Sequence, residues 1–339
     1  MKSILNNLFE HKTLDRNTAR EVMVDIGNGL YNEHQVTAFM TVFLMRSIML
    51  EELQGFQDAL LALCRKIDFK GLKTIDIVGT GGDGKNTFNI STLSCFIVAG
   101  AGHKVTKHGN YGASSISGAS NLLENLGYKF KNDNDALLKE LEETNICFLH
   151  APLFHPAMKF AAPIRKNLGM RTFFNMLGPL MNPAFPSYSM IGVNSLESAR
   201  LYNYLLQQQP NNFAIVHSLD GYDEISLTGD SKIITQDGEK NLKAIDLGKM
   251  EIKPEDIWGG SSVDEAADKF MTILRGKGTP QQEAVVLANA AVALQTTGAF
   301  PNYEACFDAA VESLKSGRAN ECLNKDRKST RLNSSHANI

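Results

Sequence analysis

The amino-acid sequence predicts an α/β protein, in which a small all-helical domain precedes a larger domain with a mainly parallel central sheet flanked by helices. Three observations support this fold class. The first 65 residues show only helical periodicity, short strands then alternate with helices from about residue 71, and glycine-rich loops follow two of those strands. A chain of 339 residues is long enough to bury a core in each of two such domains.

Helical periodicity defines the first domain. Apolar residues recur about every 3.6 positions in successive segments, and Asp15 and Asn17 are suited to cap a helix. The apolar positions are Val22, Met23, Ile26 and Leu30, then Val36, Phe39, Met40, Phe43 and Leu44, followed by an amphipathic series at 56–64. We expect most of these side chains to form the core of the helical domain.

Five short strand-like segments, separated by helical segments, follow residue 71. They are the segments 75–78, 104–107, 146–149, 190–193 and 213–217. Alternation of strands and helices is typical of a mainly parallel sheet whose connecting helices cover its faces. Several prolines between 151 and 186 indicate changes of chain direction rather than a flexible linker.

The most informative segment is 76–92, where the first strand gives way to a loop with four glycines and an aspartate between Gly79 and Gly84. Glycines allow backbone N–H groups to converge on an anion, and a helix expected at 93–101 adds partial positive charge at its N-terminus. We therefore interpret this loop as a phosphate-binding cradle.

Two standard phosphate-binding motifs match this loop only in part. Residues 79–84 fit the dinucleotide pattern G-x-G-x-x-G, but residues 85–89 delay the helix, and no carboxylate follows about 20 positions later to bind a ribose. The Walker A pattern would need serine or threonine where Asn86 stands. Asp83 would repel a bare triphosphate, so the loop suits a ligand that also presents ribose hydroxyls or hydrated metal.

A second glycine loop follows the second strand. Its sequence is Lys107-His108-Gly109-Asn110-Tyr111-Gly112-Ala113-Ser114-Ser115, and a helical segment follows it. With the first loop, it resembles the anthranilate phosphoribosyltransferase family. The resemblance extends from about residue 5 to about 323 and includes the segments 155–158, 165–172 and 175–183 and the pair Asp223-Glu224.

The resemblance implies domain boundaries. The helical domain would comprise 1–70 with a return segment at about 163–186, and the α/β domain would comprise 71–162 and 187–323. The ligand would lie in the cleft between the domains, and part of the helical surface would form a homodimer interface. Residues 324–339 are unlike the family, being polar and aperiodic, so we expect a non-native or disordered tail there.

The activity that the resemblance implies is transfer of the phosphoribosyl group from 5-phosphoribosyl 1-diphosphate to the amine of anthranilate, a step of tryptophan biosynthesis. Loss of diphosphate builds negative charge, which Mg²⁺ neutralises without proton transfer. Two Mg²⁺ ions per site would be held by Ser91, Asp223 and Glu224. Because neighbouring residues on a strand point to opposite faces, both acids reach one site only if 220–225 is a turn, which Gly221 allows.

The resemblance places the donor-binding residues in the two glycine loops and at the start of the helix after each loop. The first loop would bind the diphosphate, and the second would bind the 5′-phosphate. The implied set is Gly79, Gly82, Asp83, Thr87, Asn89, Ile90, Ser91, Thr92, Lys107, His108, Gly109, Asn110, Tyr111, Gly112, Ala113, Ser114, Ser115 and Ala119. We interpret Ser117, which lies outside this set, as a plain helix N-cap.

The acceptor would contact Gly79, Asn110 and Arg165, by the same resemblance. An arginine fork suits the carboxylate of anthranilate. The aromatic amine is neutral near pH 7, so positioning would supply most of the acceleration, and we assign no catalytic residue. The sequence departs from many family members at Tyr111, where they have arginine, and at Asn121, where they have aspartate, and both changes bear on the affinity for the acceptor.

The composition excludes several classes of protein. A formal net charge of −3 leaves no basic surface for nucleic acid, and no segment reaches the roughly 18 consecutive apolar residues of a membrane span. Five scattered cysteines without C-x-x-C spacing are typical of reduced thiols in the cytoplasm. We therefore expect a cytoplasmic protein that binds small molecules, and neither nucleic acid nor a membrane.

Two alternatives remain open from the sequence. A pyrimidine nucleoside phosphorylase has a related architecture, but it would carry a serine-glycine-arginine loop in place of His108-Gly109-Asn110. A non-catalytic relative that binds nucleic acid would have lost the acids at 223 and 224 and gained a basic groove.

Overall fold

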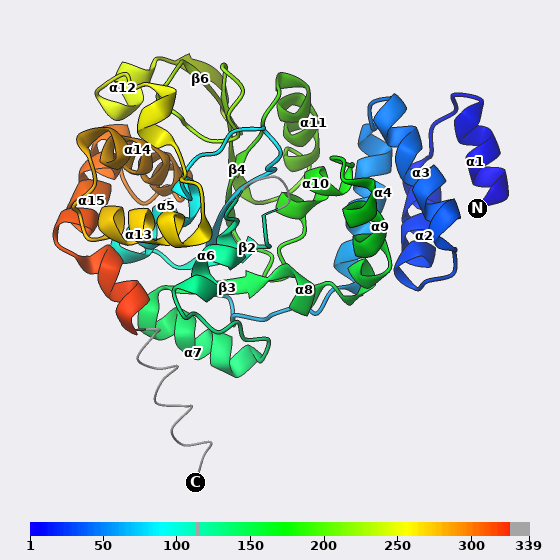
Figure 1. The fold of residues 1–339 in the computed structure, drawn as a ribbon, viewed down its shortest axis with the longest axis horizontal. Coiled ribbons are helices and arrows are strands. Elements are labelled where there is room, and N and C mark those ends of the chain that lie inside the picture. The colour runs from blue at the N-terminus through cyan, green and yellow to red at the C-terminus, as the bar shows by residue number, and fades with distance from the viewer. Residues whose placement is uncertain (113–115, 326–339) are drawn as a thin grey trace, which may run out of the picture. The chain divides into compact units, whose positions relative to one another are not determined.

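The computed structural model describes residues 1–112 and 116–325, and its chain divides into two compact units. The helical unit contains Met1–Ile67 and Ala151–Pro183, and the α/β unit contains Asp68–His150 and the chain from Ala184 onward. The segment that returns to the helical unit therefore begins at Ala151, whereas the sequence suggested a start near 163. Figure 1 labels helices of both units and several strands of the sheet.

Four N-terminal helices and a return segment of short helices make up the helical unit. The helices are α1 (Lys2–Phe9), α2 (Arg16–Gly27), α3 (Glu33–Met45), α4 (Leu50–Leu63), α8 (Ala151–Phe154), α9 (Ala161–Leu168) and α10 (Phe174–Leu177), with 3₁₀ turns at η1 (Pro156–Lys159) and η2 (Gly178–Leu180). Asp15 caps α2 by accepting a hydrogen bond from the Thr18 N–H, as expected, whereas Asn17 lies inside the helix.

Aromatic side chains join the return segment to the N-terminal helices. The rings of Phe39 and Phe56 pack edge to face with centroids 5.8 Å apart, and Phe173 from the return segment lies 4.8 Å from Phe56. A Cβ added at Gly27 would come within 2.9 Å of the Ala157 Cβ, so glycine allows α2 to approach η1 closely. The return segment is therefore part of the core of this unit.

The α/β unit contains a seven-stranded sheet with the order β3-β2-β1-β4-β5-β6-β7. Its strands are β1 (Ile75–Gly79), β2 (Val105–Gly109), β3 (Ile146–His150), β4 (Tyr188–Gly192), β5 (Asn212–Ser218), β6 (Ser231–Thr235) and β7 (Gly238–Leu242). The first five strands pair in parallel and correspond to the five runs expected from the sequence, and β6 and β7 add an antiparallel hairpin.

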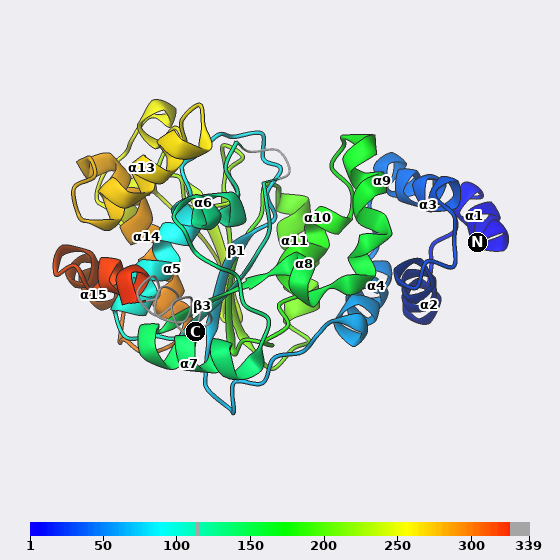
Figure 2. The same ribbon diagram turned by 60° about the horizontal axis from the view of Figure 1, so that its bottom comes forward.

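Helices cover both faces of this sheet. They are α5 (Ile90–Gly100), α6 (Ala119–Asn125), α7 (Asn134–Thr144), α11 (Leu196–Leu206), α12 (Ala244–Gly248), α13 (Val263–Leu274), α14 (Pro280–Thr296) and α15 (Tyr303–Lys315), with a 3₁₀ turn at η3 (Pro254–Ile257). The helices α5 and α14 lie on one face with α13 and α15 packed outside them, and α11 lies against β5 on the other face (Figure 2).

The strand order reverses between β1 and β4. The chain passes from β1 to β2 in one direction along the sheet and from β4 to β5 in the other, so right-handed crossovers place α5 and α11 on opposite faces. Such a reversal leaves a crevice at the carboxyl ends of the two central strands, where ligands of open α/β sheets bind. Gly79 and Gly192, which end β1 and β4, are register partners at this point.

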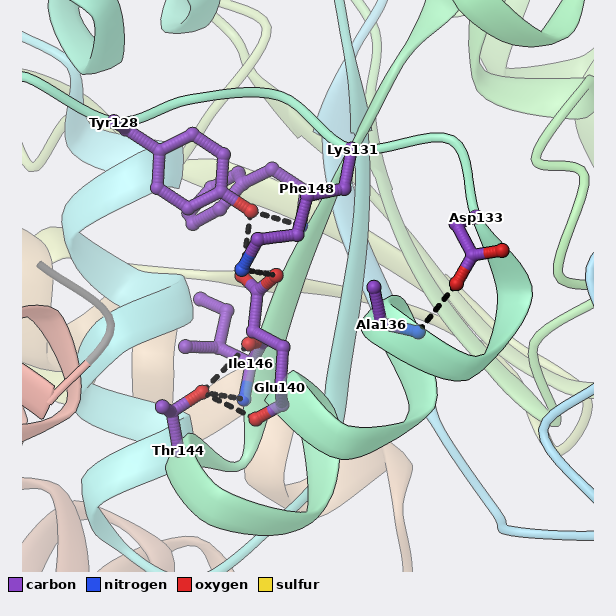
Figure 3. A network of polar contacts seen from close by, with 8 residues as sticks. All are labelled: Tyr128, Lys131, Asp133, Ala136, Glu140, Thr144, Ile146 and Phe148. Atoms are coloured by element: carbon purple, nitrogen blue, oxygen red, sulfur yellow. Dashed lines mark hydrogen bonds and ion pairs between the residues drawn. The ribbon is translucent and has the colours of Figure 1, made fainter. Parts of the chain in front are cut away.

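A buried polar network covers the outer edge of β3, one of the two edge strands of the sheet (Figure 3). The Phe148 N–H donates to the Tyr128 hydroxyl oxygen at 3.4 Å, and that hydroxyl donates to Glu140. The ammonium group of Lys131 pairs with the other carboxylate oxygen of Glu140 at 2.7 Å. The network thus satisfies a backbone group that an open edge would leave exposed.

Candidate active site

The acidic pair lies in a turn between β5 and β6. The Gly221 N–H donates to the Ser218 carbonyl at 2.8 Å, and Gly221 adopts a φ of +97°, which favours glycine. The Ser218 hydroxyl donates to the carbonyl of Glu224 at 2.7 Å and holds the far side of the turn. The turn expected at 220–225 is therefore present, and it brings both acids to the carboxyl ends of the parallel strands.

Two glycines make room for Asp223 at the strand reversal. A Cβ added at Gly79 would lie 2.3 Å from the Asp223 Oδ2, and one added at Gly192 would lie 1.6 Å from the Asp223 carbonyl oxygen. The Gly81 N–H donates to the same Oδ2 at 2.6 Å. A side chain at position 192 would displace the backbone of the acidic turn, and one at position 79 would displace the Asp223 carboxylate.

Hydroxyl groups from the first loop and from α5 face the carboxylate of Glu224. The Thr87 hydroxyl donates to Oε1 at 2.7 Å, and the Ser91 hydroxyl lies 3.5 Å from Oε2. Burial raises the pKa of Glu224 well above its usual range, and the neighbouring Asp223 raises it further. Burial also raises the pKa of Asp83 in the same loop.

This arrangement of acids fits a magnesium ion. Burial and the nearby carboxylates of Asp223 and Asp83 disfavour the charged form of Glu224, and a divalent cation would relieve both effects. Among the described residues, no group of three or more His, Cys, Asp and Glu side chains could hold a metal by itself. Mg²⁺ is commonly bound by one or two carboxylates with substrate phosphates and waters completing its shell, so Ser91, Asp223 and Glu224 are a sufficient protein contribution.

The first glycine loop is held by the segment that follows η3. The Gly259 N–H donates to the Asn86 carbonyl at 2.6 Å, and the Asn86 side-chain amide donates to the Gly260 carbonyl at 2.8 Å. Thr87 also forms an isolated antiparallel bridge with Trp258. Asn86, which breaks the Walker A pattern, therefore has a structural role in anchoring the loop.

Helix α5 begins at Ile90, three residues earlier than the expected start at 93, so the prediction of its start was wrong. Its N-cap is Asn89, and Ser91 and Thr92 lie in its first turn. The loop itself contains Gly82, which has a φ of +72°, in the left-handed region. Of the expected first-loop residues, Thr87 and Ser91 lie beside Glu224, whereas the Ile90 side chain is buried in the hydrophobic core.

The second strand places Lys107 and His108 in the interior of the α/β unit. Both side chains are buried, and the Lys107 ammonium donates to the Ile77 carbonyl at 2.6 Å. Gly109 ends β2, and the Asn110 side chain accepts a hydrogen bond from the Tyr111 N–H at 2.8 Å. The expected phosphate contacts Ala113, Ser114 and Ser115 lie outside the described residues.

The N-cap of α6 is Gly118, and Ala119 is the first residue of the helix, so the interpretation of Ser117 as an N-cap was wrong. A Cβ at residue 118 would come within 2.1 Å of the Gly112 nitrogen, which explains why glycine occupies the cap. The Asn121 side-chain oxygen accepts from the N–H groups of both Gly112 and Gly118, at 2.9 and 3.1 Å. Asn121 thereby closes the second loop.

Tyr111 packs along the same loop. Its hydroxyl donates to Glu124 at 2.8 Å, and its ring meets the His150 ring edge to face at 4.9 Å. The His150 ring in turn stacks on Phe130 at 4.4 Å. Tyr111 is therefore held against α6 and β3.

Two of the residues discussed in the sequence belong to the helical unit. Arg165 lies in α9 with its guanidinium 5.2 Å from the centroid of the Phe174 ring, and burial lowers its pKa from the usual value. His155 is buried, and this burial lowers its pKa to about 4. His155 is thus neutral at neutral pH, as a structural histidine would be.

Sequence reasoning missed two residues that shape the site. Gly192 lies in no recognised motif, and only the strand register reveals that it faces Gly79. Asn289 is buried in α14, where its side-chain amide bonds both the N–H and the carbonyl of Ile225, next to Glu224. A single polar residue within the apolar run 284–294 was the available signal for it.

Comparison with known proteins identifies the class. The helical bundle domain of a glycosyl transferase family matches residues 2–64, and the a/b domain of that family matches residues 71–320. The chain is 53% identical over 325 residues to the anthranilate phosphoribosyltransferase of Christiangramia forsetii and 54% identical to that of Flavobacterium psychrophilum, in each case covering 96% of this chain and 98% of the relative. The chain belongs to the anthranilate phosphoribosyltransferase family.

Solved structures agree with this assignment. Anthranilate phosphoribosyltransferase from Thermus thermophilus superimposes with a TM-score of 0.89 at 30% identity, covering 96% of this chain and 98% of that one. The enzyme from Saccharomyces cerevisiae in complex with PRPP and Mg gives a TM-score of 0.88 at 27% identity, covering 96% and 97%. These relatives do not favour the phosphorylase or the nucleic-acid-binding alternative. In the described parts of the chain, no helix has the length and apolar character needed to cross a membrane.

Proposed function

We propose that this chain transfers the phosphoribosyl group of 5-phosphoribosyl 1-diphosphate to the amine of anthranilate, giving N-(5-phosphoribosyl)anthranilate and diphosphate. The observation that carries the proposal is the meeting of Asp223, Glu224, Ser91 and the first glycine loop at the strand reversal of the α/β unit. Two carboxylates, a serine hydroxyl and a glycine loop together suit a ligand that carries phosphate groups and binds a divalent cation.

Ser91, Asp223 and Glu224 would hold magnesium, and we propose two ions per site. Bound Mg²⁺ would neutralise the negative charge that develops on the departing diphosphate. The contribution of the chain is to fix the oxygen ligands in advance: Thr87 orients Glu224, and the Gly81 N–H orients Asp223. Preorganised ligands of this kind need no rearrangement as charge develops.

The two glycine loops would bind the donor. In the first loop, the backbone at Gly82 and Asp83 and the hydroxyls of Ser91 and Thr92 would bind the diphosphate, because the Gly81 N–H and the Thr87 hydroxyl already donate to the acidic pair. In the second loop, Ser114, Ser115 and Ala119 would bind the 5′-phosphate, while the Gly112 and Gly118 N–H groups donate to the Asn121 side chain. Both loops project from carboxyl ends of parallel strands, where anions meet converging backbone donors.

For the acceptor, we propose that Gly79 and Asn110 contact anthranilate and that the Arg165 guanidinium pairs with its carboxylate. The amine is neutral, so the site needs no general base, and neither His108 nor His155 has to accept a proton. A homodimer formed through the helical unit and a cytoplasmic location complete the proposal, and five free cysteines support the latter.

The acidic pair provides the direct test. The double variant Asp223→Asn, Glu224→Gln should lose at least about 100-fold in magnesium-dependent turnover, because both charged ligands are gone. Loss of anthranilate fluorescence in the presence of donor and Mg²⁺ measures that rate. The exposed acid Glu239 on β7 supplies a matched control, because Glu239→Gln should leave turnover unchanged. Wild-type turnover in the double variant, or phosphate-dependent cleavage of thymidine by the wild-type protein without any consumption of anthranilate, would overturn the proposal.

A further inference from the structure

Three buried side-chain oxygens at the two glycine loops have no hydrogen-bond partner in the described structure. They are Thr80 Oγ1, Asn89 Oδ1 and Ser117 Oγ. An unpaired buried polar group costs free energy, and native proteins keep few of them. Their location at the proposed donor site suggests that a ligand satisfies them.

Ser117 is the best defined of the three, because both polar groups of the peptide bond that follows it are hydrogen-bonded. The Asn89 side-chain nitrogen donates to the Ser117 carbonyl at 2.9 Å, and the next residue, Gly118, donates its N–H to Asn121 at 3.1 Å. A carbonyl can only accept, so this bond also fixes which way the Asn89 amide faces. The Ser117 side chain is only 9% exposed, yet its hydroxyl has no partner.

Asn89 connects Ser117 to the diphosphate loop. Asn89 is the N-cap of α5, whose first turn carries Ser91, and its side chain crosses to the second loop to hold Ser117. At position 119, where the family resemblance implies a donor contact, this chain has alanine, which offers no side-chain hydroxyl. The hydroxyl of Ser117, two residues earlier, is buried and has no hydrogen-bond partner among the described residues.

We propose that the Ser117 hydroxyl donates a hydrogen bond to a phosphate oxygen of bound 5-phosphoribosyl 1-diphosphate, with Asn89 as the residue that positions it. This inference rests on the proposed function and adds a donor-binding residue to it. Phosphate oxygens are acceptors only, so a serine hydroxyl without a partner is the complementary group. Hydrogen bonds to a charged acceptor are shorter and stronger than those between neutral groups.

The test is the variant Ser117→Ala, with donor binding measured by calorimetry in the presence of Mg²⁺. The dissociation constant for 5-phosphoribosyl 1-diphosphate should rise about 10- to 100-fold, because a hydrogen bond to a charged group is lost. The melting temperature of the ligand-free protein should not fall, because the hydroxyl has no partner there to lose. Ser117→Thr keeps a hydroxyl and should recover donor binding, and the KM for anthranilate should stay unchanged in both variants.

Ser313 is the matched control. It is a buried serine of the same unit whose hydroxyl donates to the Ile97 carbonyl at 2.7 Å, so Ser313→Ala should lower the melting temperature and leave donor binding unchanged. Equal donor binding by wild type and Ser117→Ala would overturn this inference alone. A wild-type protein that does not bind the donor with Mg²⁺ would overturn the proposed function and this inference together.

Discussion

Single residues at the strand reversal decide whether the acidic turn can reach the site. Gly79 and Gly192 face each other across β1 and β4, and neither could carry a Cβ without meeting Asp223. The sequence pointed to Gly79, because it opens a recognisable glycine loop. It could not point to Gly192, because the requirement arises only once the register of two strands and the path of a distant turn are known.

Asn289 provides the first prediction. Replacement by leucine would leave the N–H and carbonyl of Ile225 buried without partners, so the free energy of unfolding should fall by about 2–4 kcal/mol. Because Ile225 follows Glu224 directly, the Mg²⁺ concentration for half-maximal turnover should also rise. Urea unfolding and a magnesium titration measure the two effects. The variant Ser313→Ala, which is also destabilised, should keep the wild-type magnesium dependence, and an equal change in both variants would show that Asn289 acts through stability alone.

His155 makes the stability of the helical unit depend on pH. Its pKa falls from 6.5 to about 4 on burial, so between these values the unfolded chain binds a proton that the folded chain does not. The free energy of unfolding should therefore decrease as the pH falls from 6.5 towards 4, by on the order of 3 kcal/mol in total. Urea unfolding at a series of pH values should give a flatter dependence for His155→Gln, and an identical slope would contradict this account.

At the scale of elements, burial determined what could be predicted. The five parallel strands are mostly buried, and four of them contain a run of apolar residues, whereas β2 is largely polar and was indicated by its place between two helical segments. Strand β7 is exposed and almost entirely polar, so it carried no such signal, and the hairpin it forms with β6 was not anticipated. The start of α5 was placed too late because the polar residues Ser91 and Thr92 obscure the first turn of an otherwise apolar helix.

The polar network at the edge of β3 predicts a stability effect that leaves the chemistry unchanged. Tyr128→Phe removes the acceptor for the Phe148 N–H and the donor to Glu140 (Figure 3), so the free energy of unfolding should fall by about 1–3 kcal/mol. Amide exchange at Phe148 should accelerate, while the KM values for both substrates stay the same. Tyr204→Phe on α11 is the control, because that side chain is 59% exposed and should have no effect. Full stability in the Tyr128 variant would show that the network is dispensable.

At the scale of the whole molecule, the α/β unit contains nearly every residue that we propose to bind substrate, and the helical unit contributes Arg165. The order of the motifs revealed both domains in the sequence, but the start of the return segment at Ala151 depends on packing, such as that of Phe173 against Phe56, which no local pattern reveals.

Donor binding should therefore stabilise the α/β unit. At a donor concentration about 100 times the dissociation constant, with Mg²⁺, the gain is about 2.7 kcal/mol, which raises the melting temperature by several degrees. Trp258 is the only tryptophan in the chain and belongs to this unit, so its fluorescence reports the transition there. The double variant Asp223→Asn, Glu224→Gln should show little or no shift, and a full shift in that variant would argue against these acids as metal ligands.

The bridge between Trp258 and Thr87 has a spectroscopic consequence. Indole emission overlaps the near-ultraviolet absorption of anthranilate, and all of it originates at one position of the chain. Resonance energy transfer from this indole would dim its emission and sensitise that of the bound aromatic amine. Occupancy of the acceptor site could then be followed in unlabelled protein, even in variants too slow to turn over.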